Sequence, residues 1–252
     1  MKPAARIASL ASTLVLLMAC VTETTGVPEP ASKEDRLAAQ INLARGYLES
    51  ADPGRARGPL ERALEIDSGS ADALGLLAVF YQQEGEIKLA EDYYRRALRS
   101  DPRHAPNLNN YAALLYSQGR YQEALDPLRR LVAITSYRGR AQAYESLGLT
   151  ELRAGSRQKA REAFEQALRL TPEMSGSALE LAELAFNDGD NVAASRYYEQ
   201  YRSRERQTPR SLCLGIDLAR AVGDADQRAS YEIVLRNMYP DAPETARCTS
   251  GR

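Results

Sequence analysis

The sequence has few of the residues on which catalytic and metal sites depend. Its 252 residues include one histidine, His104, and three cysteines, and they contain neither a GxxxxGKS/T nor an HExxH motif. One histidine cannot supply a multi-histidine metal site, and Cys213 has no nearby histidine to activate it as a nucleophile. We therefore expect no enzyme activity, no cofactor and no metal site. His104, in the segment "DPRHAP", is expected to lie in a solvated loop.

The sequence also lacks an excess of charge of one sign. Its 33 Lys and Arg residues nearly balance its 34 Asp and Glu residues. The basic residues form no long stripe, and short pairs such as Arg95-Arg96 and Arg129-Arg130 are typical of solvated helix faces. This pattern argues against a nucleic-acid partner, and no motif indicates a small-molecule substrate.

Long hydrophobic runs are absent apart from one near the N-terminus. Lys2 and Arg6 lead into an uncharged segment, residues 7–19, which has the length of a secretory signal and is too short to span a bilayer. Its end, Leu17-Met18-Ala19-Cys20, resembles the lipobox of bacterial lipoproteins. The resemblance implies that residues 1–19 are a signal peptide and that Cys20 becomes the lipidated N-terminus. An ordinary signal peptide that contains a cysteine is the alternative.

Lipidation would determine where the protein resides. Acyl chains such as palmitate on Cys20 would hold the chain firmly at a membrane, because several chains bind far more strongly than one. Val21 follows Cys20, and the absence of Asp there resembles lipoproteins of the bacterial outer membrane. Residues 20–32, rich in Thr and Pro, are expected to form an extended tether that reaches at most about 40 Å. We therefore expect an outer-membrane lipoprotein that faces the periplasm.

The rest of the chain repeats itself every 34 residues. In "ADALGLLAVFYQQEGEIKLAEDYYRRALRSDP", residues 71–102, apolar residues follow helical spacing on both sides of Gly85, and Pro102 ends the second helix. This segment resembles the tetratricopeptide repeat (TPR), in which small residues let two helices approach and Gly and Pro end them. The pattern recurs six times over the domain 33–242, in repeats 37–70, 71–104, 105–138, 141–174, 175–208 and 209–242.

The resemblance implies an all-α fold, a superhelical solenoid of six helix-turn-helix repeats. Two extra residues separate the third repeat from the fourth. The sixth repeat is degenerate, because Arg228 and Glu232 stand where small and aromatic residues belong, as expected of a polar terminal repeat. Residues 243–252 are expected to form a C-terminal tail.

The resemblance also places a concave groove on the first helix of each repeat, at positions 2, 5, 9 and 12. In the first five repeats these positions are mostly uncharged, which indicates a groove for an apolar or amphipathic segment of a partner protein. Any single apolar residue among them could instead pack between helices. The predicted partner-binding residues are Ile41, Arg45, Leu48, Val79, Gln82, Asn109, Tyr116, Leu149 and Leu152.

A carboxylate clamp of the kind found in chaperone-binding TPR domains is a more specific alternative. Asn110 matches one clamp position. Gly75 and Val79 in the preceding repeat, and Gln142 and Ser146 in the following one, cannot supply the cationic partners. We therefore do not expect a clamp.

Two cysteines remain if Cys20 carries lipid. Cys213 lies at position 5 of the sixth repeat, and Cys248 lies at position 6 of where a seventh repeat would lie, so the two could be neighbours. In an oxidising periplasm a disulfide between them would persist and would hold the tail against the last repeat. Two buried free thiols are the alternative.

A lipobox, a short tether, six repeats and a C-terminal cysteine pair together resemble the pilotin family of type IV pilus biogenesis lipoproteins (PilF/PilW type). The resemblance implies a scaffold that binds the pilus secretin and promotes its outer-membrane localisation and multimerisation, and hence twitching motility. Two other TPR lipoproteins are alternatives. One belongs to the outer-membrane β-barrel assembly machinery, and the other recruits peptidoglycan hydrolases.

Overall fold

The structure is a computed structural model that describes residues 31–50 and 52–250. Over these ranges it consists of α-helices, one 3-10 helix and their connecting turns, with no β-strand. The prediction of an all-α TPR solenoid is confirmed. The predicted signal peptide, Cys20 and nearly all of the tether lie outside the described residues.

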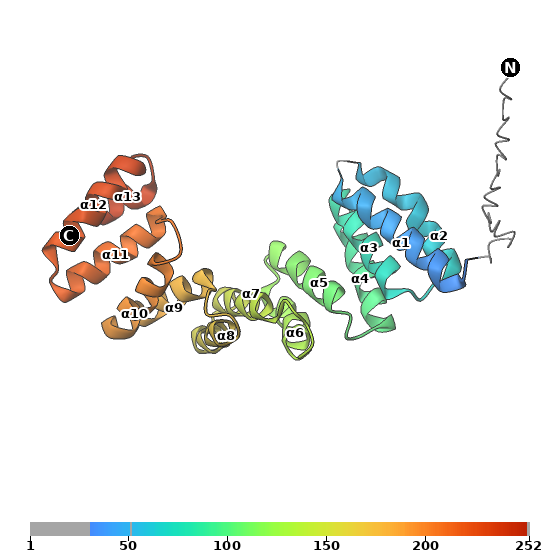
Figure 1. The fold of residues 1–252 in the computed structure, drawn as a ribbon, viewed down its shortest axis with the longest axis horizontal. Coiled ribbons are helices and arrows are strands. Elements are labelled where there is room, and N and C mark those ends of the chain that lie inside the picture. The colour runs from blue at the N-terminus through green and yellow to red at the C-terminus, as the bar shows by residue number, and fades with distance from the viewer. Residues whose placement is uncertain (1–30, 51, 251–252) are drawn as a thin grey trace, which may run out of the picture. The chain divides into compact units, whose positions relative to one another are not determined.

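Six helical hairpins follow one another along residues 33–238, and neighbouring hairpins pack together in chain order (Figure 1). Their helices are α1 (Lys33–Glu49) and α2 (Arg57–Ile66), α3 (Ala71–Gln83) and α4 (Ile87–Ser100), α5 (Ala105–Ser117) and α6 (Tyr121–Val132), α7 (Arg140–Arg153) and α8 (Arg157–Leu170), α9 (Ser175–Asn187) and α10 (Asn191–Arg202), and α11 (Pro209–Val222) and α12 (Ala225–Met238). A 3-10 helix, η1 (Pro53–Ala56), precedes α2, and a short helix, α13 (Pro243–Thr249), follows α12. The helix pairs therefore coincide with the repeats counted in the sequence.

Glycines with left-handed backbone set the turns within the hairpins. Gly85, Gly119, Gly155, Gly189 and Gly223 end the first helices of repeats two to six with φ between 71° and 83°. Residues with a Cβ rarely adopt this conformation, so glycine lets the chain reverse at each of these points. The spacing between successive turns is the physical origin of the repeat seen in the sequence.

Alanines form the closest contacts inside the hairpins. At or just before the first turns of the second helix in each of the first five repeats, an alanine is completely buried, and a larger apolar residue one turn later fills the adjacent space. The alanines are Ala56, Ala90, Ala124, Ala160 and Ala194, and the larger residues are Leu60, Tyr94, Leu128, Phe164 and Tyr198. On α7 the small residue is Gly148, where a Cβ would stand 2.6 Å from the Phe164 ring. The core is thus a continuous layer between paired helices.

The sixth repeat departs from this pattern at the residues that the sequence singled out. Arg228 and Glu232 form an ion pair with 3.6 Å between Nε and Oε1, in place of a small and an aromatic residue. The segment predicted as a tail contains α13, which packs on α11 and α12. A short helix therefore ends the array.

The first repeat begins earlier than predicted. Helix α1 starts at Lys33, four residues before the boundary drawn at residue 37. Leu43, which matches a core position of the repeat, is 43% exposed because no earlier hairpin within the described residues covers this side of α1. Its counterpart on α3, Leu77, is buried.

Candidate partner-binding groove

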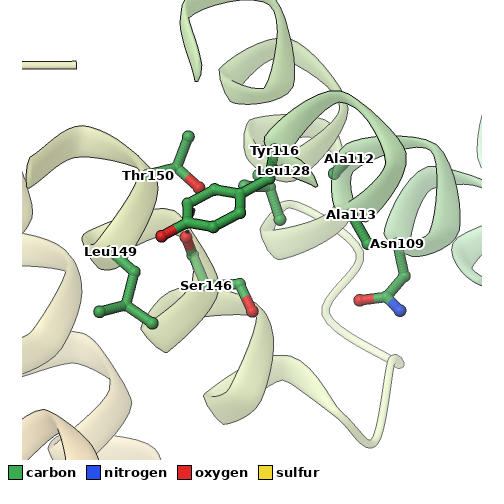
Figure 2. Close-up of a pocket in the computed structure, with 8 residues that line it drawn as sticks. All are labelled: Asn109, Ala112, Ala113, Tyr116, Leu128, Ser146, Leu149 and Thr150. Atoms are coloured by element: carbon green, nitrogen blue, oxygen red, sulfur yellow. Dashed lines mark hydrogen bonds between the residues drawn. The ribbon is translucent and has the colours of Figure 1, made fainter. Parts of the chain in front are cut away.

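A pocket opens on the concave face between the third and fourth repeats (Figure 2). Its volume is about 210 Å³. Helix α5 contributes four of its lining residues, α6 one and α7 three. These are Asn109, Ala112, Ala113 and Tyr116, then Leu128, then Ser146, Leu149 and Thr150. We call this space the α5–α7 pocket.

The connection between α6 and α7 explains why the pocket lies here. This connection includes the two extra residues that interrupt the repeat, and it packs Ile134 into the core. Arg140 at the start of α7 donates from Nε to the Val132 carbonyl at 2.8 Å, which fastens α7 to the end of α6. Helix α3 packs on both α1 and α5, whereas α7 packs mainly on α6 and α8. The first helices of repeats three and four are therefore separated by a space that a partner can enter.

The pocket has an apolar interior and polar groups at its edge. The Tyr116 ring reaches from α5 toward Leu149 on α7 (Figure 2), and it packs edge to face against Tyr121 with 5.1 Å between ring centroids. Thr150 donates its hydroxyl to the Ser146 carbonyl at 2.7 Å, so this group is satisfied within α7. The Asn109 amide and the Ser146 hydroxyl supply polar groups around the apolar surface.

Three of the predicted groove residues, Asn109, Tyr116 and Leu149, meet in this pocket. Leu152, one turn further along α7, is half-buried and packs with residues of α8 and α9. Val79 on α3 is half-buried between the first and second hairpins, and Gln82 accepts a hydrogen bond from the Tyr94 hydroxyl at 3.4 Å. The predicted residues thus spread over several sites, of which the pocket is one.

Ile41 and Leu48, two of the residues predicted on α1, are buried and offer a partner little surface. Each is only 8% exposed. Ile41 packs with Ala63 and Ala73, and Leu48 packs with Leu77 and other residues of the core formed by α1, α2 and α3. Because α1, α2 and α3 lie close together, these positions face helices rather than an open groove.

Arg45, the remaining predicted residue on α1, belongs to a polar cluster. Its guanidinium lies 3.7 Å from the Asp72 carboxylate. His104 Nε2 lies 3.4 Å from the same carboxylate, and His104 Nδ1 accepts a hydrogen bond from the backbone N–H of Asn107. The hydrogen bond with His104, and to a smaller extent the charges of His104 and then Arg45, lowers the pKa of Asp72.

The prediction that His104 is a solvated loop residue is therefore wrong. Its side chain is 15% exposed, and it caps the N-terminus of α5. An imidazole that accepts at Nδ1 can donate from Nε2, so both ring nitrogens have partners. Its position directly before Ala105-Pro106, at a helix start, is the sequence signal for a cap.

A group of carboxylates lies beyond the pocket on α7 and α9. Burial, and secondarily the charge of Glu180, raises the pKa of Glu145 on α7. Arg210 on α11 donates to Glu180 at 2.7 Å and to Glu183 at 2.6 and 2.7 Å. These hydrogen bonds raise the pKa of Arg210, so it stays cationic and joins α11 to α9.

Helix α13 packs on α11 beside its groove positions. Glu244 and Arg247 of α13 border the same hollow as Arg210, Cys213 and Asp217, which occupy three of the four groove positions of the sixth repeat. The structure joins Cys213 to Cys248 with 5.6 Å between their Cα atoms. Of the groove positions of the last repeat, Cys213 is thus bonded to α13, and charged residues line the hollow beside it.

Some pocket residues could not be found from groove positions alone. Ala112, Ser146 and Thr150 lie at other positions of their repeats, and Leu128 belongs to a second helix. The two-residue interruption was the available signal, because it changes how α7 is placed. Within the described part of the chain there is no helix suited by length and hydropathy to cross a membrane, and no cluster of metal-ligating side chains.

Comparison with known proteins agrees with this architecture. Family models of the tetratricopeptide repeat match residues 69–136, 104–173 and 145–210. The type IV pilus assembly protein PilF of Pseudomonas aeruginosa is 41% identical over 230 residues, which cover 90% of this chain and 91% of PilF. TPR proteins mediate protein–protein interactions, and the open pocket is consistent with such a role.

Two solved structures resemble the chain over most of its length. That of P. aeruginosa PilF has a TM-score of 0.76 and covers 85% of this chain and 97% of its own. That of PilW, described as a widely conserved type IV pilus biogenesis factor, is 26% identical, with a TM-score of 0.67, and covers 84% of this chain and 97% of its own.

Proposed function

Because this chain belongs to the tetratricopeptide-repeat family of type IV pilus assembly proteins, we propose that it is a pilotin. In this proposal it is an outer-membrane lipoprotein that binds the pilus secretin and promotes its localisation and multimerisation. It carries out no chemical step. Binding alone produces the effect, since a secretin subunit held near the membrane reaches a higher local concentration there.

The observation that carries the proposal is the α5–α7 pocket. On α1 the groove positions are buried or ion-paired, and on α11 they are mostly charged and border a hollow shared with α13. Between α5 and α7 an apolar surface of Ala113, Tyr116 and Leu149 remains open, with polar groups at its edge. Pockets of this composition bind apolar side chains and use a few polar groups to orient the segment that carries them.

The lipid anchor would supply the second part of the mechanism. In the mature chain Cys20 would be fixed in the periplasm-facing leaflet of the outer membrane, and residues 20–32 would link it to α1. Acyl chains hold the protein in one membrane, while the pocket holds the secretin subunit. Anchoring and binding together would therefore decide in which membrane the secretin assembles.

Ala113 offers the sharpest test of the pocket, because it is exposed and lines it. Ala113→Asp should leave the fold intact and weaken capture of the purified secretin subunit by at least about 30-fold, since a charge must be desolvated in an apolar site at a cost of about 2 kcal/mol. Ala39→Asp, at an exposed alanine of α1, is the matched control and should bind normally. In cells, Cys20→Ser should leave the secretin outside the outer-membrane fraction.

Three outcomes would contradict the proposal. Equal affinity of Ala113→Asp and the unaltered protein would remove the pocket from the binding site. Co-purification of a β-barrel assembly protein or a peptidoglycan hydrolase in place of the secretin would assign the chain to another scaffold. Retention of Cys20→Ser in the outer membrane would reject the lipid anchor.

A further inference from the structure

A carboxylate beside the α5–α7 pocket takes part in none of the ion pairs formed by the described residues. Glu145 lies on α7 one turn before Leu149 and directly before Ser146, and both of these line the pocket. Residues four apart on a helix are neighbours on its surface. Glu145 therefore lies next to the place where a partner's side chain would enter.

Gly176 on α9 leaves the space that the Glu145 carboxylate occupies. A Cβ at Gly176, in the first turn of α9, would collide with Glu145 Oε1. Any side chain at residue 176 would thus have to displace the carboxylate. Gly176 is exposed and Glu145 is half-buried, so the carboxylate is held between α7 and α9 at the edge of the groove.

The surroundings of Glu145 provide no cation for it. Arg140 on α7 donates to the Val132 carbonyl and lies over the Tyr144 ring, 5.6 Å from its centroid. On α9 the charged group that acts on Glu145 is Glu180, which carries charge of the same sign. Arg210 on α11 binds both Glu180 and Glu183, so its donors are directed at other carboxylates.

The opposite side of the pocket differs in charge. The residues that α5 presents to it are neutral, and Gln82 on α3 is neutral as well. The charged pair further along the groove, Asp72 and Arg45, is already matched, with His104 beside it. The pocket is therefore apolar and neutral on the α5 side and bordered by negative charge on the α7–α9 side.

We infer that the partner segment bound here carries one large apolar residue for the α5–α7 pocket and a lysine or arginine close to it that pairs with Glu145. This inference rests on the proposed function, in which the partner is the secretin subunit, and specifies the chemistry of the segment that binds. Charge complementarity at the edge of an apolar pocket sets orientation and register more than it sets total affinity. Glu145 would fix the direction in which the segment lies across α7.

The experiment compares the secretin subunit's affinity for the unaltered chain, Glu145→Gln and Glu173→Gln at two salt concentrations. Glu173 lies in the exposed turn between α8 and α9 and is the matched control. At low salt, Glu145→Gln should weaken binding about 5- to 10-fold, and its affinity should change less with salt than that of the unaltered chain. Glu173→Gln should match the unaltered chain in both respects.

Gly176→Ala serves as a second variant, because it displaces the Glu145 carboxylate without changing the net charge. It should weaken binding less than Glu145→Gln. Thermal unfolding of each variant shows whether a loss of binding follows from loss of the fold.

The outcomes separate this inference from the function on which it rests. If Ala113→Asp abolishes binding while Glu145→Gln keeps normal affinity and normal salt dependence, the pocket stands and the cationic partner residue is rejected. If neither variant has an effect, both proposals fail. A secretin segment mapped to the pocket by crosslinking that lacks Lys and Arg would also overturn the inference.

Discussion

The concave face of this protein has an apolar pocket at its third and fourth repeats and a charged hollow, bordered by α13, at its sixth. Between α5 and α7 the helices stand apart and leave an apolar pocket. On α11 the equivalent positions are Arg210, Cys213 and Asp217, and α13 lies against them. The groove positions of a first helix can therefore line a binding pocket or contact another part of the chain. Which of the two they do depends on the distance to the neighbouring first helix and on whether another element, such as α13, packs beside them.

The two regions also differ in how they hold charge. At the sixth repeat, Arg210 is matched by Glu180 and Glu183, and Asp217 pairs with Arg220 at 2.9 Å. Beside the pocket, Glu145 has no such match among the described ion pairs. A partner that binds by charge would therefore be directed toward the middle of the array rather than toward its end.

Removing the link between Cys213 and Cys248 should have the largest effect on stability. The cysteines are 35 residues apart, and a crosslink that closes a loop of this length stabilises by about 3 to 4 kcal/mol in the chain-entropy model. The double variant Cys213→Ser/Cys248→Ser should unfold at lower urea concentration by that amount. Its affinity for the secretin should be unchanged, because α13 does not line the α5–α7 pocket.

A thiol count on the denatured, unreduced protein provides an independent check. With Cys20 in thioether linkage, we expect no free thiol. Two free thiols would contradict the disulfide. A large loss of secretin affinity in the double variant would show that this end of the array belongs to the binding site.

Tyr116→Ala should have a smaller effect on stability but a clear effect on binding. The ring pairs with Tyr121, and loss of such a pair costs about 1 kcal/mol. Tyr47→Ala is the matched control, because Tyr47 is also half-buried and contacts Arg55, but it lies outside the pocket. Both variants should unfold more easily in urea, and only Tyr116→Ala should bind the secretin more weakly. Equal affinities would exclude the pocket.

Asp72→Asn should have the smallest effect on the stability of the fold, and the size of this effect should depend on pH. Because the folded state lowers the pKa of Asp72, the ionised group contributes stability above the ordinary pKa of a carboxyl group, and this contribution is lost as pH falls through the lowered pKa. The group is about half exposed, so we expect less than about 1 kcal/mol at pH 7. Asp92→Asn, at an exposed site of α4, is the control.

Urea unfolding at neutral pH and at about pH 3 measures this contribution. The difference between Asp72→Asn and the unaltered chain should shrink at the lower pH. A difference that stays constant or grows would show that the pair with His104 does not stabilise the fold through the ionised carboxylate.

The fold could be predicted because its turns and its closest helix contacts each require a particular residue. Gly85 and Gly119 stand 34 residues apart and both need left-handed backbone. Ala90 and Ala124 keep the same spacing and are completely buried. Local chemistry of this kind repeats in the sequence, so the hairpin boundaries could be located without a structure.

The site was harder to predict, because exposure depends on the distance between helices. Position within a repeat places Leu48 and Leu149 on the same side of their helices. Leu48 is nevertheless buried where α1 and α3 lie close, whereas Leu149 borders a pocket where α5 and α7 separate. The two extra residues before α7 were visible in the sequence, but their effect on helix spacing was not.

Because Cys213 and Cys248 form a disulfide, the attachment of α13 to α11 depends on the redox conditions around the protein. Cytosolic reductants keep thiols reduced, so a copy that has not left the cytosol would lack this bond, and α13 would be attached to α11 by weak contacts only. Oxidation would then act as a finishing step that marks an exported molecule as complete.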